Sequence, residues 1–154
     1  MTNPDGFAKI LFRVPADDGT DDVETLWAKP LGDDRYELAN SPFYAYGVSW
    51  KDTVFAPFDP AEELPCVERV DAKSGHRTVR VIFEERARKK GRADRVLQAL
   101  VKLGCTYEGA DPRFFSVDLP PGVDLDTVCE LLVENDTEWE YADPTYDSLF
   151  PEEA

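Results

Sequence analysis

His76 is the only histidine of the chain, and it stands in a Ser-Gly-His turn between two expected strands. Its side chain titrates near neutral pH, which suits a general base, and a thiol from Cys66, Cys105 or Cys129 would complete a Cys–His pair. Cys105 and Cys129, however, fall at apolar positions of an expected strand and helix, where cysteine behaves as a small hydrophobic residue. We therefore interpret His76 mainly as a residue that opens a strand and hydrogen-bonds to a neighbouring loop, and keep it as a weak catalytic candidate.

The spacing of the residues does not match the usual motifs for binding metals or cofactors. One histidine and three scattered cysteines do not make a zinc motif. Residues 17–24 form an acidic loop that lacks the register and the distant bidentate glutamate of a calcium loop. The chain has no glycine-rich phosphate cradle, nucleophile elbow or dinucleotide fingerprint. We therefore predict no metal site and no cofactor. The sequence favours a non-catalytic role without deciding whether the protein is an enzyme.

Acidic side chains recur at helical spacing near the C-terminal end. Asp126, Glu130 and Glu134 are separated by four residues each, so they share one face of the expected second helix. The series continues into Glu138 and Glu140. Complementary charge speeds the association of proteins, so this stripe predicts a docking face for a basic partner. The alternative, at least as well supported by the pattern alone, is a solvated face of an acidic protein.

A dense aromatic block lies in the N-terminal half. Tyr44, Tyr46 and Trp50 follow Phe43 within eight residues. Tyrosine and tryptophan are favoured anchors at protein interfaces, which makes these side chains candidates for partner binding. The alternative is that they fill the interior of the first half or the seam between the two halves.

Charge is divided unevenly along the chain. Residues 76–104 carry nine bases and three acids, whereas residues 105–154 carry fourteen acids and a single base, Arg113. The net charge of −15 and the pI near 4.3 disfavour nucleic acid and anionic membranes, and they favour a basic protein partner. The basic run comprises Arg86, Arg88, Lys89, Lys90, Arg92 and Arg95. One interpretation is that it pairs with the acidic helix or tail, within the chain or across a dimer.

The cellular compartment follows from the cysteines and the N-terminus. Three cysteines without short spacing indicate free thiols in a reducing compartment. The first residues have neither a basic nor an apolar region typical of a signal peptide, and no apolar run approaches the roughly 18 residues that span a bilayer. We therefore predict a cytoplasmic protein without a membrane segment.

The elements that must position these residues change character at residue 76. Residues 1–75 contain short apolar runs separated by turns, at 7–14, 24–31, 36–38, 48–58 and 67–70, which predict a small β-barrel-like half. Residues 76–143 read as strand, helix, strand, strand, helix, strand, a ferredoxin-like (βαββαβ) half. In that half the apolar positions from Ala93 to Leu103 have helical spacing, and Asp124 is a good N-cap. The predicted class is α+β, with an acidic C-terminal tail at residues 144–154.

Several short motifs resemble a known bacterial family. They are Lys9-Ile10-Leu11-Phe12, Leu26-Trp27-Ala28, Pro42-Phe43-Tyr44-Ala45-Tyr46-Gly47-Val48-Ser49 and Ser74-Gly75-His76-Arg77-Thr78-Val79-Arg80. Together they resemble the family catalogued as domain of unknown function 4265, over about residues 7–142. Lys51 departs from the pattern, because the resemblance implies a glycine before Asp52. A family without an assigned activity implies a fold and an extent rather than a function.

The function hypothesis is therefore drawn from charge and from the missing catalytic motifs. We predict a non-catalytic acidic protein-binding module, for example an immunity or antitoxin protein that neutralises a basic toxin. Asp126, Glu130, Glu134, Glu138 and Glu140 would steer the partner, and Tyr44, Tyr46 and Trp50 would anchor it. The alternatives are a small-molecule-sensing regulatory domain and, with less support, a hydrolase that uses His76.

Overall fold

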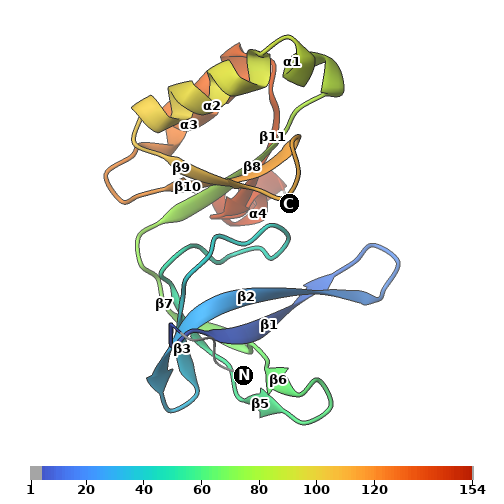
Figure 1. Ribbon diagram of the computed structural model, residues 1–154, viewed down its shortest axis with the longest axis vertical. Coiled ribbons are helices and arrows are strands. Elements are labelled where there is room, and N and C mark those ends of the chain that lie inside the picture. The colour runs from blue at the N-terminus through green and yellow to red at the C-terminus, as the bar shows by residue number, and fades with distance from the viewer. Residues whose placement is uncertain (1–4, 154) are drawn as a thin grey trace. The chain divides into compact units, whose positions relative to one another are not determined.

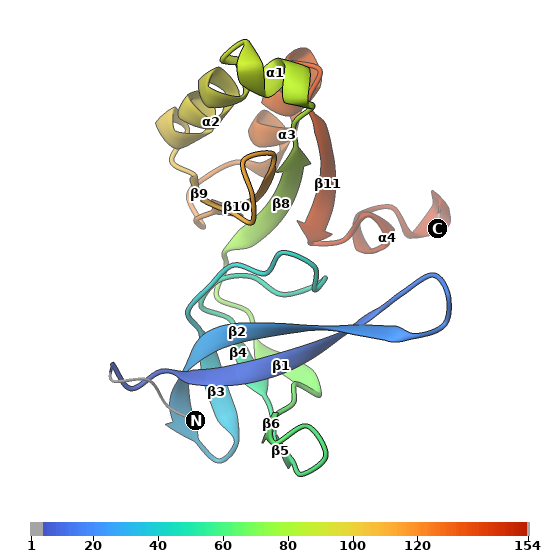
Figure 2. The same ribbon diagram turned by 45° about the vertical axis from the view of Figure 1, so that its right-hand side comes forward.

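The structure, a computed structural model, describes residues 5–153. The chain divides into two compact units, Met1–Gly75 and His76–Ala154 (Figures 1 and 2). Both units are built on antiparallel sheets, and the helices belong to the second unit. The mixed α+β class predicted from the sequence is therefore confirmed.

The first unit is a five-stranded antiparallel sheet whose strands follow one another in space as β1-β2-β3-β4-β7. The strands are β1 (Ala8–Pro15), β2 (Asp21–Gly32), β3 (Arg35–Leu38), β4 (Thr53–Phe55) and β7 (Arg69–Ala72). A separate two-stranded sheet consists of β5 (Phe58–Asp59) and β6 (Leu64–Pro65). Apolar residues alternate along the long hairpin, so that Ile10 and its cross-strand partner Leu26 face the same core as Leu38 and Val54.

This sheet does not close into a barrel within the described residues, which corrects the barrel-like interpretation. Its edge strands, β1 and β7, do not pair with each other. The chain after β6 approaches β1 only at one parallel bridge between Leu11 and Cys66, beside a hydrogen bond from the Val67 N–H to the Leu11 carbonyl. Closure needs a continuous ladder between the edge strands, and one bridge is too short for that.

Of the strand expected at residues 48–58, the structure forms only β4 and the first residue of β5. β4 covers only three residues, and the chain before it turns at Lys51, whose φ of +68° lies in the left-handed region. The Asp52 carboxylate accepts the Ser49 N–H at 2.9 Å, which closes the turn. The sequence indicates a strand with Lys51-Asp52 as a candidate bend inside it, and in the structure this bend is a turn that precedes β4.

The second unit is a four-stranded antiparallel sheet in the order β11-β8-β10-β9. The strands are β8 (Arg77–Ile82), β9 (Thr106–Gly109), β10 (Phe114–Leu119) and β11 (Glu138–Asp143), and the helices between them are α1 (Glu85–Lys89), α2 (Arg92–Lys102) and α3 (Leu125–Glu134). α2 and α3 lie against one face of the sheet (Figures 1 and 2). The core contains Val79, Val81 and Val117 from the strands, packed with Leu100 and Leu132 from the helices.

The two longer helices form where their apolar spacing predicted them. α2 buries Ala93, Val96, Leu97 and Leu100, and the chain leaves it at Gly104 with a φ of +107°. The side chain of Asp124 caps α3 by accepting the Thr127 N–H at 3.0 Å. The short helix α1 was not predicted, because its five residues carry no apolar periodicity and none of them is buried.

The C-terminal residues, expected as a tail, contain two short helical segments. These are α4 (Tyr146–Leu149) and the 3-10 helix η1 (Pro151–Glu153). The ring of Tyr146 lies 6.3 Å from that of Tyr141 in β11 and 4.9 Å from that of Phe150. The aromatic side chains therefore hold this segment against the end of the sheet.

Candidate functional site

The outer face of α3 presents a row of carboxylates to solvent. Asp126, Glu130 and Glu134 are exposed, whereas Val128 and Leu132 on the opposite face are fully buried. Val133, with 62% of its surface exposed, lies on the same side as the acids. Across residues 5–153, no ion pair involves these three carboxylates. The helix thus carries negative charge that the described part of the chain leaves available to a partner.

β11 directs Glu138 and Glu140 to the other side of the sheet from α3. The side chains of a strand alternate between its faces, and Trp139 packs against the core that the helices cover. Glu140 lies opposite Arg80 of β8 and forms an ion pair with it at 3.4 Å. The acidic stripe expected from the sequence is therefore divided between the outside of a helix and the far face of a sheet.

The basic run around α1 neutralises little of this acidic surface. Arg88 pairs with Glu85 on its own helix. Arg92 donates to the carbonyl of Asn135 at the end of α3 and lies 4.0 Å from the carboxylate of Asp136. That last contact is the single ion pair within residues 5–153 that joins the basic run to the acidic segment. Internal pairing, one of the alternatives considered above, is limited to this point.

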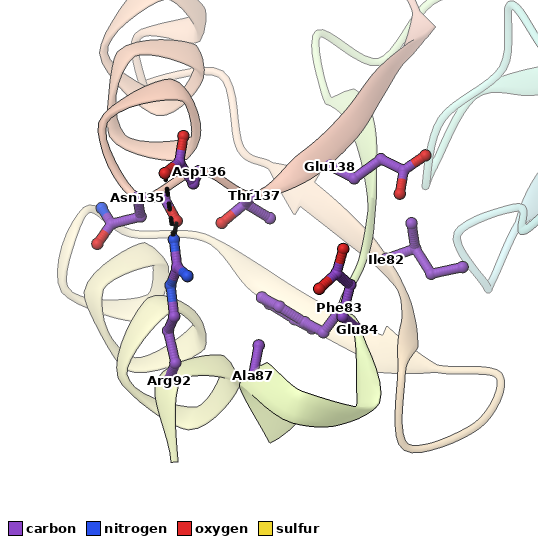
Figure 3. A pocket seen from close by; sticks show the side chains of 9 residues that line it. All are labelled: Ile82, Phe83, Glu84, Ala87, Arg92, Asn135, Asp136, Thr137 and Glu138. Atoms are coloured by element: carbon purple, nitrogen blue, oxygen red, sulfur yellow. Dashed lines mark hydrogen bonds and ion pairs between the residues drawn. The ribbon is translucent and has the colours of Figure 1, made fainter. Parts of the chain in front are cut away.

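A hollow of about 270 Å³ lies where the basic and acidic segments meet (Figure 3). Figure 3 shows Arg92 on one side of it, Glu84 and Glu138 on the other, and the ring of Phe83 between them. The remaining lining residues are Ile82, Ala87, Asn135, Asp136 and Thr137. A second hollow of about 350 Å³ shares Ile82 and Glu138 with the first, and its other lining residues are Arg80, Val81, Phe114, Trp139 and Glu140. Sequence reasoning named Glu138 and Glu140 but not Glu84, nor the depressions that these acids border.

His76 is paired with a carboxylate rather than with a thiol. Its Nδ1 lies 2.8 Å and 3.0 Å from the two carboxylate oxygens of Asp118 in β10, and both side chains are largely buried. The partner thus comes from a neighbouring strand and not from the loop that the sequence suggested. Burial, reinforced by the negative charge of Asp118, raises the pKa of Cys105 to about 11. A thiol with this pKa stays protonated near neutral pH and is a poor nucleophile.

Burial also disfavours the thiolate form of the other two cysteines. All three cysteines are free and buried. Burial raises the pKa of Cys66 and that of Cys129. A side-chain hydrogen bond joins Cys129 to Tyr141 of β11, and burial with this bond raises the pKa of Tyr141 to about 12. These groups fit the packing role expected for buried cysteines.

The aromatic candidates lie in the loop between β3 and β4 of the first unit. Tyr44 and Tyr46 expose 55% and 51% of their surface. Trp50 is half-buried, and the Nζ of Lys51 lies 4.7 Å from its ring centroid. Tyr44 and Tyr46 are thus placed as exposed side chains, whereas Trp50 is partly covered.

Two buried carboxylates, which the sequence reasoning missed, shape this loop. Glu24 of β2 is buried and accepts the backbone N–H groups of Phe43, Tyr44 and Ala45 at 2.6, 3.1 and 2.9 Å. An acid at an inward-facing position of a strand is the signal that could have revealed it. Its three hydrogen bonds hold the aromatic block in one conformation.

Asp52 performs the same task for the Ser-Gly-His turn. It is fully buried and accepts the Ser74 N–H at 2.7 Å in addition to that of Ser49. The Nζ of Lys73 lies 2.5 Å from the same carboxylate. Two motifs of the resemblance, those that contain Ser49 and Ser74, are therefore joined by the buried Asp52 carboxylate, which gives them a structural role.

Within residues 5–153, no group of three or more His, Cys, Asp or Glu side chains is arranged to hold a metal ion. Over the same residues, no helix has the length and apolar character needed to cross a membrane.

The fold and the charged surfaces define an α+β protein of mostly antiparallel sheets, with an acidic helix and adjoining hollows in its second unit. The chain belongs to the DUF4265 family, whose description is domain of unknown function, and the match covers residues 24–141. A comparison with curated proteins found no match.

The chain is also similar to a solved structure described as a novel crystal structure of a hypothetical protein from Neisseria gonorrhoeae. The TM-score is 0.76 with 14% sequence identity, over 91% of this chain and 96% of that one. At this level of identity the likeness concerns the fold alone.

Proposed function

We propose that the protein is a non-catalytic, acidic binding module that docks a basic protein. The observation that carries the proposal is the row formed by Asp126, Glu130 and Glu134, exposed on α3 and without an ion pair in the described part of the chain. Such a row attracts a positively charged surface at long range. When that surface covers the row, its charges compensate the carboxylates for much of the lost contact with water. Val133 adds an apolar contact at the same face.

The module fits an immunity or antitoxin protein that blocks a basic toxin in the cytoplasm. Glu138 and Glu140 would contact the same partner only where it extends around the edge strand β11, because they face away from α3. Tyr44 and Tyr46, exposed on the first unit, are the proposed anchors, with Trp50 supporting them. The strand order of the second unit, with every neighbouring pair antiparallel, supports the finer interpretation of a ferredoxin-like arrangement.

A small-molecule-sensing role is the second candidate, and the two hollows at the end of β8 favour it. It predicts that a small ligand raises the melting temperature in the absence of any protein partner. Neither candidate requires His76 to act as a catalyst.

Charge reversal on α3 tests the main proposal. The tagged protein is used to capture partners from its native lysate at low and high salt, with identification by mass spectrometry. We expect a basic protein that is retained near 50 mM salt and released near 500 mM, because salt screens exposed charges. The double variant Glu130→Lys with Glu134→Lys should lose that partner.

The matched control reverses two acids of the loop at residues 17–22, Asp17→Lys with Asp22→Lys. This variant has the same net charge as the first but an unchanged α3, so it should retain the partner. Equal retention of the partner by both double variants would show that α3 is not the docking face.

A further inference from the structure

The hollow shown in Figure 3 combines a negative rim with an apolar floor. Glu84, Asp136 and Glu138 supply three carboxylates, against a single guanidinium from Arg92. That guanidinium is already engaged, because it donates to the Asn135 carbonyl and faces Asp136. The remaining charge of the lining is therefore negative, and the C-terminal end of α3 adds the negative end of its dipole.

Three apolar side chains line part of the hollow, beside the charged groups of its rim. Phe83, Ala87 and Ile82 contribute apolar surface to the lining. Of the residues in α1, Ala87 is the one that lines the hollow, and the bases of that helix are absent from its wall. The volume of about 270 Å³ lies just below the roughly 300–1,000 Å³ typical of small-molecule pockets. A space of this size and polarity suits one long cationic side chain.

We propose that this hollow receives the side chain of an arginine from the basic partner, an inference that rests on the proposed function. The methylene stem would cover Phe83 and Ala87, and the guanidinium would lie between the carboxylates of Glu84 and Glu138. Arginine is favoured over lysine because its planar guanidinium stacks on aromatic rings and donates to several acceptors at once. The guanidinium is also more weakly hydrated than an ammonium group, so its transfer from water into the hollow costs less free energy.

Binding of a capped amino acid to the isolated full-length protein tests the site without the partner. The probe is Nα-acetyl-arginine N-methylamide, which carries only the side-chain charge, and binding is followed by NMR titration. We expect shifts confined to residues of the hollow, with weaker binding of the matching lysine compound. The glutamine compound should not bind.

Two variants examine the two halves of the proposal. Glu84→Gln with Glu138→Gln removes the charge and should weaken binding of the probe about tenfold or more, since each hydrogen bond to a charged group is strong. Ala87→Leu keeps every charge but fills the floor, and it should weaken binding as well. The control, Asp17→Asn with Asp22→Asn, has the same charge as the first variant, lies outside both proposed sites and should bind the probe like the native protein.

The outcomes separate this inference from the proposed function. If the arginine probe does not bind, or binds the variants of the hollow as well as the control, the inference is overturned. The docking role of α3 would still stand on the capture experiment with Glu130→Lys and Glu134→Lys. Loss of the partner there without any effect of the hollow variants on capture would likewise leave α3 as the docking face and exclude the hollow.

Discussion

At the scale of single residues, buried carboxylates organise the loops of the first unit. Glu24 holds three backbone N–H groups of the aromatic loop, and Asp52 joins the turn at Ser49 to the turn at Ser74. Charge-assisted hydrogen bonds of this kind are stronger than neutral ones, and leaving the buried partner groups unpaired is costly. These two acids therefore give a structural role to the aromatic block and to the Ser-Gly-His turn.

Lys51 is strained at the turn that Asp52 closes, and this leads to a prediction. A φ of +68° is unfavourable for any residue with a Cβ atom, by roughly 1–2 kcal/mol, whereas glycine adopts it freely. We expect Lys51→Gly to be more stable than Lys51→Ala by about 1 kcal/mol in the free energy of unfolding, measured by urea denaturation. Both variants lose the contact between Lys51 and Trp50, so that loss cancels in the difference between their stabilities.

The opposite order would contradict this account of the turn. If Lys51→Ala proved the more stable variant, the backbone at this position would not be held in the left-handed region. The glycine expected here from the family resemblance would then need another explanation.

At the scale of elements, α3 connects stability and the proposed binding face. Its N-cap, Asp124, accepts hydrogen bonds from the hydroxyl and the N–H of Thr127, at 2.7 and 3.0 Å. These bonds lower the pKa of Asp124, with that from the hydroxyl as the largest cause. Asp126 lies in the same first turn but points to solvent, so the two acids form a natural comparison.

We predict that Asp124→Ala lowers the melting temperature more than Asp126→Ala, since only the first removes the cap. Asp124→Asn should remain close to the native protein at pH 7, because asparagine is an equally good cap. The folded-state pKa of Asp124 lies below its unfolded value. The charged cap therefore contributes stability above the unfolded pKa of about 3.9 and loses it as the pH falls through the folded pKa.

Urea midpoints at pH 7 and near pH 2.5 measure this difference. The native protein should lose stability relative to Asp124→Asn on acidification, since asparagine does not titrate. A constant difference in urea midpoint between the native protein and Asp124→Asn over this pH range would show that the carboxylate of Asp124 does not act as a charged cap.

At the scale of the whole molecule, charge is the dominant property. The net charge of −15 arises from 32 acids against 17 bases. The ion pairs found within residues 5–153 are mostly exposed, such as Arg13 with Asp59 at 3.3 Å and Arg35 with Asp71 at 2.8 Å. Exposed pairs contribute little to stability, so self-repulsion should outweigh them.

We therefore expect the melting temperature to rise when sodium chloride is increased from about 10 to 150 mM. Over this range the Debye length falls from about 30 to 8 Å, which screens the long-range repulsion more than the contacts at close range. Differential scanning calorimetry at constant pH measures the change. A fall in melting temperature would mean that attractive pairs, such as Lys73 with the buried Asp52, outweigh the repulsion.

The sequence by itself determined the elements whose signals are local. The apolar spacing of α2, the cap at Asp124 and the change of period near His76 depend on neighbouring residues, so they could be read without a structure. The acids of α3 were placed correctly on one exposed face for the same reason. The family resemblance also rested on short contiguous motifs, and the match over residues 24–141 supports it.

Only the tertiary structure decided what depends on residues far apart in the chain. Thr78, Arg80, Ser116 and Asp118 alternate with valines in β8 and β10, which predicts a solvated face, yet all four are buried. The pairing of His76 with Asp118, the hollow beside Phe83 and the open edges of the first sheet likewise join distant segments. Burial and the closing of a sheet are properties of the packed chain as a whole, so the local periodicity of the sequence does not predict them.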